Sequence, residues 1–300
     1  MLDFTTDAAN IVSVLAEHNR IIADFAPASL TTRAAPTVSS RYSFINSVKA
    51  LDILADYGFH PTAAQQQKSR DKSKAPFAAH MLRFQNEAFR TSEGIPELLL
   101  LNSHNRRTSL GLGQGFFRYA CSNNVVLATS GIFQRLRHNA ATEAAFENLV
   151  KEKAAGLPET MARIERLQYR SLSFERRYTL VADMCKARGW KFSSIDFDGK
   201  FKKSPGAAKN QTYFTGSTLD DLLTSRRDAD AFPTVWNIFN RVQECFCSAN
   251  NGFKPVRVLS TSTKYPEGRL RIARSIRSIA GNTALNAKLF DLAEGALEHA

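Results

Sequence analysis

The sequence has no run of 18 apolar residues, so we expect no helix that crosses a membrane. Cysteine is scarce, with four in 300 residues, and Cys245 and Cys247 are one residue apart, which is not the spacing of a zinc knuckle. So few cysteines predict a reduced, cytoplasmic protein. No carboxylate stands between Glu97 and Glu143, so this region lacks the clustered acids that two-metal nuclease chemistry requires.

The charge is unbalanced in favour of bases. Lysine and arginine number 40 against 28 aspartates and glutamates, which gives a formal net charge of +12. An excess of this size favours a polyanionic partner, either nucleic acid or an anionic membrane surface. We expect nucleic acid and no membrane, while noting that many basic proteins bind nothing charged.

The pattern of apolar residues predicts an α+β protein, with a mostly antiparallel sheet, helices packed on one face and a helical insertion. Alternation and short apolar runs indicate strands between residues 59 and 137, including a buried strand at Leu98–Leu101 and a strand–turn–strand at Phe116–Leu127. Helices are expected at 47–57 with Gly58 as the C-cap, at about 140–155, 158–170 and 173–188, and again near both ends of 233–298. Residues 190–213 are expected to form a basic, aromatic-rich loop.

Four segments follow from this pattern. They are an N-terminal helix and arm (1–35), a sheet-rich core (36–138), a helical insertion with a basic loop (139–232), and a helix–strand–helix that completes the core (233–300).

One polar stretch is central to the chain. The apolar run Leu98–Leu101 ends at Asn102-Ser103-His104, and Arg118 leads through Cys121 to Asn123 and a second apolar run. Buried polar groups need partners. Such side chains between two core strands therefore indicate either a structural polar network or a site.

The same residues carry a family resemblance. The segments NSHNRRTS, FFRYACSNNVV and RLRH resemble the signature of the phage/plasmid-like proteins of domain-of-unknown-function family 932, and further anchors extend over roughly residues 35–290. The chain departs from the family pattern at two points. His104 is followed by Asn105-Arg106 instead of Asp-Gly, and Asn123 is followed by Asn124 instead of Gly. The resemblance implies a phage- or plasmid-encoded protein in a bacterial host cell, with no established reaction.

Three reaction types can be tested against the motifs. Cys121 could act as a nucleophile with His104 as its base and Asn123 as an orienting amide, but buried cysteines of no chemical role are common. His80, His104 and His138 lack the spacing of a metal site, and Gly111-Leu-Gly113-Gln-Gly115 lacks the Lys-Ser/Thr of a phosphate-binding loop. We therefore expect no metal and no cofactor.

A structural interpretation competes with these chemistries. A network could link sheet and helix, with Glu244 as partner of Arg118 or Arg241 in a charge-assisted pair. The catalytic candidates, none of them strongly indicated, are His104, Cys121 and Glu244. The expected members of the network are Asn102, Ser103, Asn123, Asn240, Arg241 and Glu244.

The leading hypothesis is a nucleic-acid-binding protein that favours single-stranded DNA and acts in replication, recombination or protection of a mobile element. One alternative is an enzyme that acts on nucleic acid or nucleotides through the clusters Asn102–His104 and Arg118–Asn123; another is a host-interaction or anti-defence protein. We favour a protein without enzymatic activity, and assembly of several copies is compatible with the sequence. The expected nucleic-acid contacts are Arg83, His104, Arg106, Arg107, Arg118, Arg135, Arg137, Lys200, Lys202, Lys203, Arg269, Arg271, Arg274 and Arg277.

Overall fold

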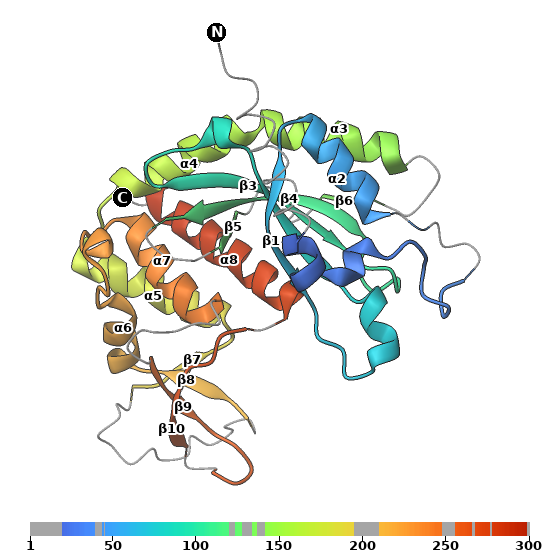
Figure 1. The fold of residues 1–300 in the computed structure, drawn as a ribbon. Coiled ribbons are helices and arrows are strands. Elements are labelled where there is room, and N and C mark those ends of the chain that lie inside the picture. The colour runs from blue at the N-terminus through green and yellow to red at the C-terminus, as the bar shows by residue number, and fades with distance from the viewer. Residues whose placement is uncertain are drawn as a thin grey trace. The chain divides into compact units, whose positions relative to one another are not determined.

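The computed structural model describes residues 20–39, 44, 46–119, 124–127, 134–136, 142–194, 210–247, 256–265, 268–276 and 278–298. The chain forms two compact units, Met1–Pro158 and Glu159–Ala300. Each unit combines helices with a sheet, so the predicted α+β class is confirmed (Figure 1). The border between the units lies within the segment 139–232 that the sequence pattern groups as one insertion.

The sheet of the first unit is antiparallel throughout, as predicted. Its order is β1-β2-β3-β4-β5, and β6 pairs with the first residues of β4 while β5 pairs with the last. The strands are β1 (His60–Gln66), β2 (His80–Gln85), β3 (Gly94–Asn102), β4 (Leu110–Arg118), β5 (Asn124–Leu127) and β6 (Gln134–Leu136).

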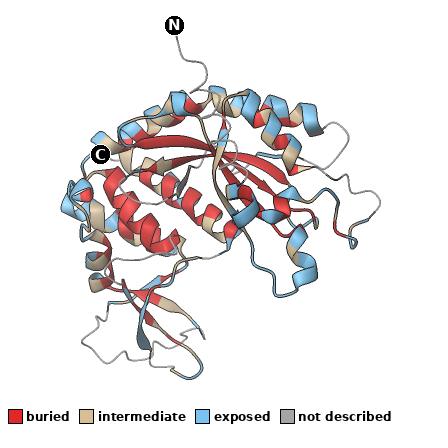
Figure 2. Ribbon diagram, viewed as in Figure 1, coloured by how far each residue is buried: buried red, intermediate tan, exposed pale blue. Residues whose placement is uncertain are grey.

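One face of this sheet forms an apolar core. Leu82, Leu100 and Leu112 lie opposite one another on β2, β3 and β4, and therefore share a face. They belong to the same buried cluster as side chains of helices α2 (Ser47–Asp56) and α3 (Thr142–Ala155). Every residue of β3 is buried, so both faces of the central strands are covered (Figure 2).

Helix α2 has the boundaries that the sequence indicates. The side chain of Asn46 accepts a hydrogen bond from the backbone N–H of Val48 at 2.9 Å and caps the first turn. After Tyr57 the chain leaves the helix at Gly58, whose φ of 76° lies in the left-handed region that favours glycine. The predicted helix and its glycine C-cap are confirmed.

Strand β4 begins earlier than expected, at Leu110 instead of Phe116. Gly111, Gly113 and Gly115 therefore lie within the strand, on the face opposite to Leu112 and Phe116. Glycine has a low strand propensity, but β4 is hydrogen-bonded on both sides, and this pairing outweighs the local preference.

The second unit is mainly helical. Its helix α7 is buried along its entire length, and Phe239 on it packs edge-on against Phe290 with ring centroids 5.7 Å apart. The predicted helices at 158–170 and 173–188 are confirmed as α4 and α5. The helices are α4 (Leu157–Tyr169), α5 (Phe174–Ala187), α6 (Gly216–Leu223), α7 (Val235–Cys247) and α8 (Ile279–Glu298).

A small sheet completes the second unit, in the order β10-β9-β8-β7. Two of its strands lie in the segment 190–213, which the sequence predicts as a loop, because strands of two and three residues are too short to show alternation. The pair β7–β8 is parallel and the other two pairs are antiparallel. The strands are β7 (Lys191–Phe192), β8 (Thr212–Phe214), β9 (Arg257–Ser260) and β10 (Arg269–Ile272).

Two glycines give a matched test of the packing. A Cβ atom at Gly94 would overlap the carbonyl oxygen of Phe117 and come within 2.7 Å of the Phe116 ring, whereas one at Gly295 in α8 would meet nothing within 4 Å. We expect Gly94→Ala to lower the free energy of unfolding by roughly 1–3 kcal/mol through overpacking. Gly295→Ala should raise it by up to about 1 kcal/mol, because alanine is the better helix former. Denaturant unfolding of both variants tests this, and equal effects would contradict the β3–β4 packing described above.

Candidate nucleic-acid interface

The polar stretch at the end of β3 is buried. Asn102 donates from Nδ2 to Ser47 Oγ at 3.1 Å, and Ser47 Oγ lies 3.0 Å from His80 Nε2. His80 Nδ1 lies 3.1 Å from the carbonyl oxygen of Ala78, which can only accept, so Nδ1 carries the proton and Nε2 accepts from Ser47. Asn102, Ser47 and His80 are fully buried, so this relay joins β3, α2 and β2 inside the first unit.

His104 is also fully buried. Its ring lies 5.2 Å from that of His80 and 4.8 Å from that of Phe44, and its backbone exchanges hydrogen bonds with Phe77 and Ala35. A side chain in this position is not accessible to a phosphate or to a substrate. The placement does not support the expected roles of His104 in nucleic-acid contact or catalysis. Instead, the backbone of His104 joins the segments that contain Ala35 and Phe77.

Two of the arginines expected to contact nucleic acid are buried as well. Arg83 on β2 is 3% exposed and forms an ion pair with Glu97 on β3, whose other oxygen accepts from Gln85 at 2.7 Å. Arg118 at the end of β4 is 1% exposed. A buried guanidinium is stable only when it is paired or hydrogen-bonded, so these side chains serve the interior of the fold. This placement does not support the expected phosphate contacts of Arg83 and Arg118.

Other expected contacts of the first unit are on its surface. Arg106 and Arg107 are exposed in the turn after β3, where Arg106 adopts a φ of 65°, and Arg135 is exposed on β6. Several expected residues lie outside the described part of the chain, and these are Cys121, Asn123, Arg137, His138, Lys200, Lys202, Lys203 and Arg277.

The polar residues of α7 hold elements of the second unit together. Arg241 donates to the carbonyl oxygens of Leu223 and Asp230, and Asn240 donates to that of Trp236. Glu244 forms a two-pronged ion pair with Arg227, at 2.5 and 3.0 Å. The sequence suggested Arg118 or Arg241 as its partner and missed Arg227, which lies 17 residues away in the loop after α6.

The described cysteines are poor nucleophiles. Burial raises the pKa of the Cys245 thiol to about 11 and that of Cys247 to about 12, and it raises the pKa of Cys185 as well. Thiols with such pKa values stay protonated at neutral pH. Within the same described ranges, no three or more His, Cys, Asp or Glu side chains are placed to hold a metal, and no helix has the length and apolar character to cross a bilayer.

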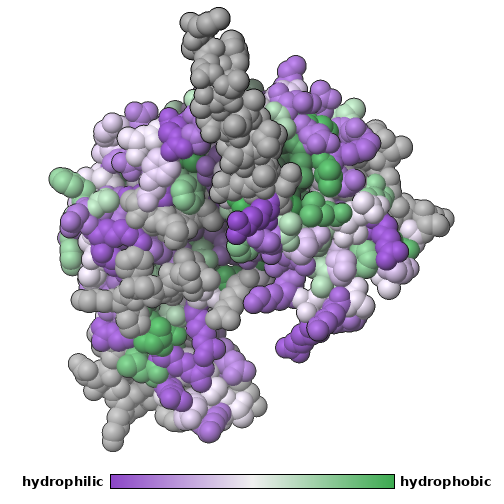
Figure 3. Space-filling model, in the orientation of Figure 1, coloured by the Kyte–Doolittle hydropathy of each residue, from purple (hydrophilic) through white to green (hydrophobic). Residues whose placement is uncertain are grey.

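Three expected arginines come together at one edge of the small sheet. Arg269 and Arg271 on β10 and Arg274 just beyond it are exposed, and with Leu270 and Ile272 they line a hollow of about 530 Å³. We call this surface, residues 269–274, the basic ribbon. All four residues of β10 are exposed, and among the described strands β10 is an edge strand that pairs only with β9. In the part of Figure 3 that holds the small sheet, apolar atoms lie beside hydrophilic ones.

Tyr265 supports the first of these arginines. The Arg269 guanidinium lies 5.2 Å from the centre of the Tyr265 ring, and the Lys264 ammonium lies 5.6 Å from it. Such cation–π contacts hold a guanidinium in place while leaving its N–H groups free to donate. The sequence analysis missed Tyr265 and Lys264, although a basic and aromatic pair before a basic strand was a usable signal.

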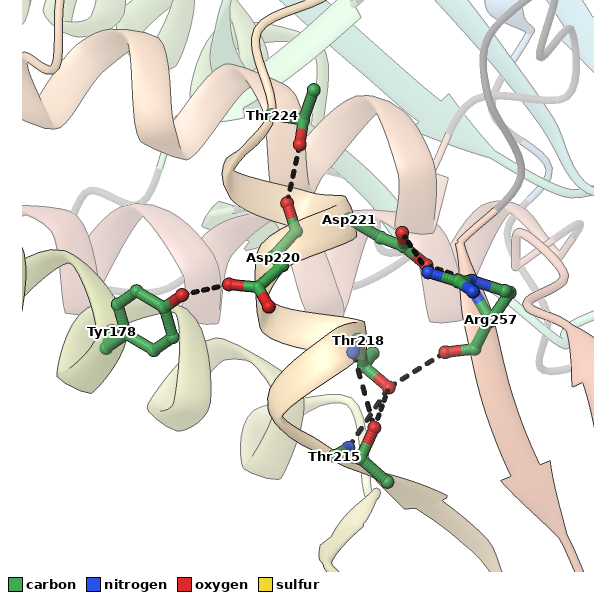
Figure 4. A network of polar contacts seen from close by, with 7 residues as sticks. All are labelled: Tyr178, Thr215, Thr218, Asp220, Asp221, Thr224 and Arg257. Carbon is green, nitrogen blue, oxygen red and sulfur yellow. Dashed lines mark hydrogen bonds and ion pairs between the residues drawn. The ribbon is translucent and has the colours of Figure 1, made fainter. Parts of the chain in front are cut away.

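Hydrogen bonds fix the end of the basic ribbon at which Ile272 pairs with Arg257. At the start of β9, Arg257 is held by Asp221 at 2.9–3.1 Å, and its carbonyl oxygen accepts from Thr218 on α6 at 2.8 Å (Figure 4). Beyond β10, the carbonyl oxygen of Arg274 accepts from Arg188 at 3.0 Å. Separate contacts therefore hold the Arg269 guanidinium and the backbone at the far end of the ribbon.

Comparison with known proteins places this geometry in a wider context. Residues 35–289 match the family model described as "Domain of unknown function (DUF932)". The UPF0380 protein YfjQ of Escherichia coli (strain K12) is 26% identical over 261 residues, covering 85% of this chain and 82% of the relative. The UPF0380 protein YafZ of the same organism is 26% identical over 264 residues, covering 86% and 84%. No solved structure matches significantly.

The buried relay predicts a pH dependence of stability. Burial lowers the pKa of His80 to about 4, below the ordinary value of 6.5. Between about pH 6.5 and pH 4 the unfolded chain therefore binds a proton at His80 that the folded chain does not bind. The stabilisation from the neutral, buried His80 is complete above about pH 6.5 and is lost as the pH falls toward 4. The loss should reach about 3 kcal/mol in the free energy of unfolding. Denaturant unfolding at pH 7, 5.5 and 4.5 should show a smaller loss for His80→Gln than for the wild type.

His60→Gln is the matched control, because it removes an exposed imidazole from the neighbouring strand β1. If both variants flatten the pH dependence to the same extent, the effect does not come from the buried position of His80.

Proposed function

The chain belongs to the family described as a domain of unknown function (DUF932), and we propose that it binds nucleic acid through the basic ribbon, with single-stranded DNA as the preferred form. The proposal extends to a role in replication, recombination or protection of the DNA of a phage or plasmid. The observation that carries it is the clustering of Arg269, Arg271 and Arg274 around one hollow on an exposed edge strand.

The electrostatics of the ribbon favour an anion. Within the described residues, Arg269, Arg271 and Arg274 form no ion pair, in contrast to Arg83 and Arg227. Free guanidiniums bind phosphate through two parallel N–H donors. The whole chain carries a net charge of +12, which adds long-range attraction to any polyanion.

The geometry of the ribbon favours an extended strand. Side chains two residues apart on a β-strand are separated by about 6.6 Å along its axis. A single strand that follows this row of charges has unpaired bases available for contact, whereas a duplex keeps its bases paired and stacked. Leu270 and Ile272 are 47% and 51% exposed on the same strand, and they offer apolar surface to bases.

The enzymatic alternative receives less support from the geometry. Asn102 and His104 are fully buried and Arg118 is almost so, and the described thiols are protonated at neutral pH. A reacting group must come within hydrogen-bond reach of its substrate. Asn102, His104 and Arg118 are better explained as the polar interior of the first unit.

The double variant Arg269→Ala/Arg271→Ala tests the proposal. Wild-type protein should bind a labelled single strand with an affinity that falls by orders of magnitude between about 50 and 300 mM salt, because counterions are released on binding. The variant should bind roughly a hundredfold more weakly, or weaker still, at low salt, since each of the two lost charge-assisted contacts costs about 1.5 kcal/mol or more. Its slope of log affinity against log salt should fall by about 0.7 for each lost contact.

Lys68→Ala/Arg70→Ala is the matched control, because it removes two exposed cations with the same spacing from a loop of the first unit. Equal losses in the two double variants would show that net charge, and not the ribbon, determines binding. Failure of the wild type to bind at low salt would refute the proposal, and cleavage of the strand on addition of magnesium would favour an enzyme.

A further inference from the structure

The second unit carries a group of exposed aromatic side chains away from the ribbon residues. Tyr169 and Phe232 are 80% and 74% exposed, more than any other large apolar side chain of the described residues, and Phe174 is 61% exposed. Exposed apolar groups that cluster are commonly binding sites, whereas isolated ones are ordinary. We call these three side chains the aromatic surface.

Backbone hydrogen bonds join the two segments that carry these three residues. The turn between α4 and α5 forms an antiparallel bridge with the segment before α7, at Ser171 and Thr234. Leu172 N–H donates to Pro233 at 3.2 Å, and Val235 N–H donates to Arg170 at 2.8 Å. This register places Phe232 across from Ser173, directly before Phe174, and Tyr169 at the other end of the bridge.

The aromatic surface has a rigid support. Leu172 and Val235, on the two paired segments, are buried and anchor the bridge. The Phe174 ring packs on that of Tyr178 with centroids 4.7 Å apart, and Tyr178 donates a hydrogen bond to Asp220 (Figure 4). Because the Phe174 ring is held in this way, it loses little conformational entropy when a ligand stacks on it.

The charge around these rings is basic. Residues 166–177 and 231–234 contain four arginines and one carboxylate, Glu175. Arg166, Arg170 and Arg176 are exposed, and none of them forms an ion pair within the described ranges. The Glu175 carboxylate accepts from its own backbone N–H and from Ser173, which lowers its pKa and directs it to the first turn of α5.

Exposed rings interleaved with arginines match one chemical class of ligand. Unpaired bases stack on aromatic side chains while arginines contact the phosphates, and a duplex cannot stack in this way because its bases are already stacked on one another. We propose that Tyr169, Phe174 and Phe232 form a second contact of this protein, which binds the unpaired bases of single-stranded nucleic acid. This inference rests on the proposed function, and it adds a second source of selectivity for single strands to that of the basic ribbon.

The variant Tyr169→Ala/Phe232→Ala tests the inference and spares Phe174, which packs on Tyr178. Binding of a single-stranded oligonucleotide should weaken by at least roughly fivefold for each ring, because stacking contributes about 1–3 kcal/mol per base. Affinity for a duplex of the same length should not change, nor should the salt dependence, since neither ring carries charge. A fluorescent base analogue in the strand should be quenched by the wild type and less so by the variant.

Two further variants serve as controls. Phe25→Ala removes a 62% exposed ring from the first unit and should leave all binding unchanged. Tyr169→Trp/Phe232→Trp keeps the stacking surface and should retain single-strand affinity. Both aromatic positions are exposed, so the melting temperatures of all these variants should stay close to that of the wild type.

The outcomes separate this inference from the proposed function. A wild type that binds neither single strands nor duplex refutes both. A wild type that binds, with an alanine variant that binds single strands equally well, refutes the aromatic surface alone. Equal losses of affinity for single strands and for duplex would also refute it. So would an alanine variant with unchanged DNA affinity and a changed sedimenting mass, because that result would make the surface a contact between protein molecules.

Discussion

The first unit depends on the pairing of β3 with β4, which are buried on both faces. In such a position no polar side chain can rely on water, so each needs a partner within the protein. Arg83 and Glu97 meet this requirement through an ion pair, and Asn102, Ser47 and His80 meet it through the relay to the Ala78 carbonyl oxygen. In the sequence, the polar residues of the central stretch look like a functional site. These contacts explain why they lie inside the fold instead.

The second unit depends on a different constraint, since its small sheet has too few residues to hold itself. Strands of two to four residues are stable only when neighbouring elements fix them. Helix α6 supplies this support through Asp221 and Thr218 at the start of β9, and Arg188 supplies it beyond the end of β10. The cationic side chains of β10 are thereby left for the surface, and structural and binding roles are divided between different arginines.

Much of the fold could be predicted from the sequence, and the reasons for the exceptions are physical. Gly58 marked the end of α2, and long stretches typical of helices marked α4 and α5. The strands β7 and β8 carry too few residues for a periodic signal, and the expected strand began at Phe116, after the glycines of β4. Among the candidate nucleic-acid contacts, the residue type alone could not distinguish the buried Arg83 from the exposed Arg271. Burial and ion pairing arise only when strands that are distant in the sequence meet. The partner of Glu244 was missed for the same reason.

The exposed edge of β10 has a consequence for the behaviour of the protein in concentrated solution. An edge strand with free backbone N–H and C=O groups and exposed Leu270 and Ile272 is a template on which another chain can add a strand. When two such edges approach, however, Arg269 and Arg271 of one molecule meet those of the other, and their repulsion opposes pairing. The arginines therefore protect the molecule against edge-to-edge aggregation, so substitutions that neutralise them lower its solubility as well as its attraction for polyanions.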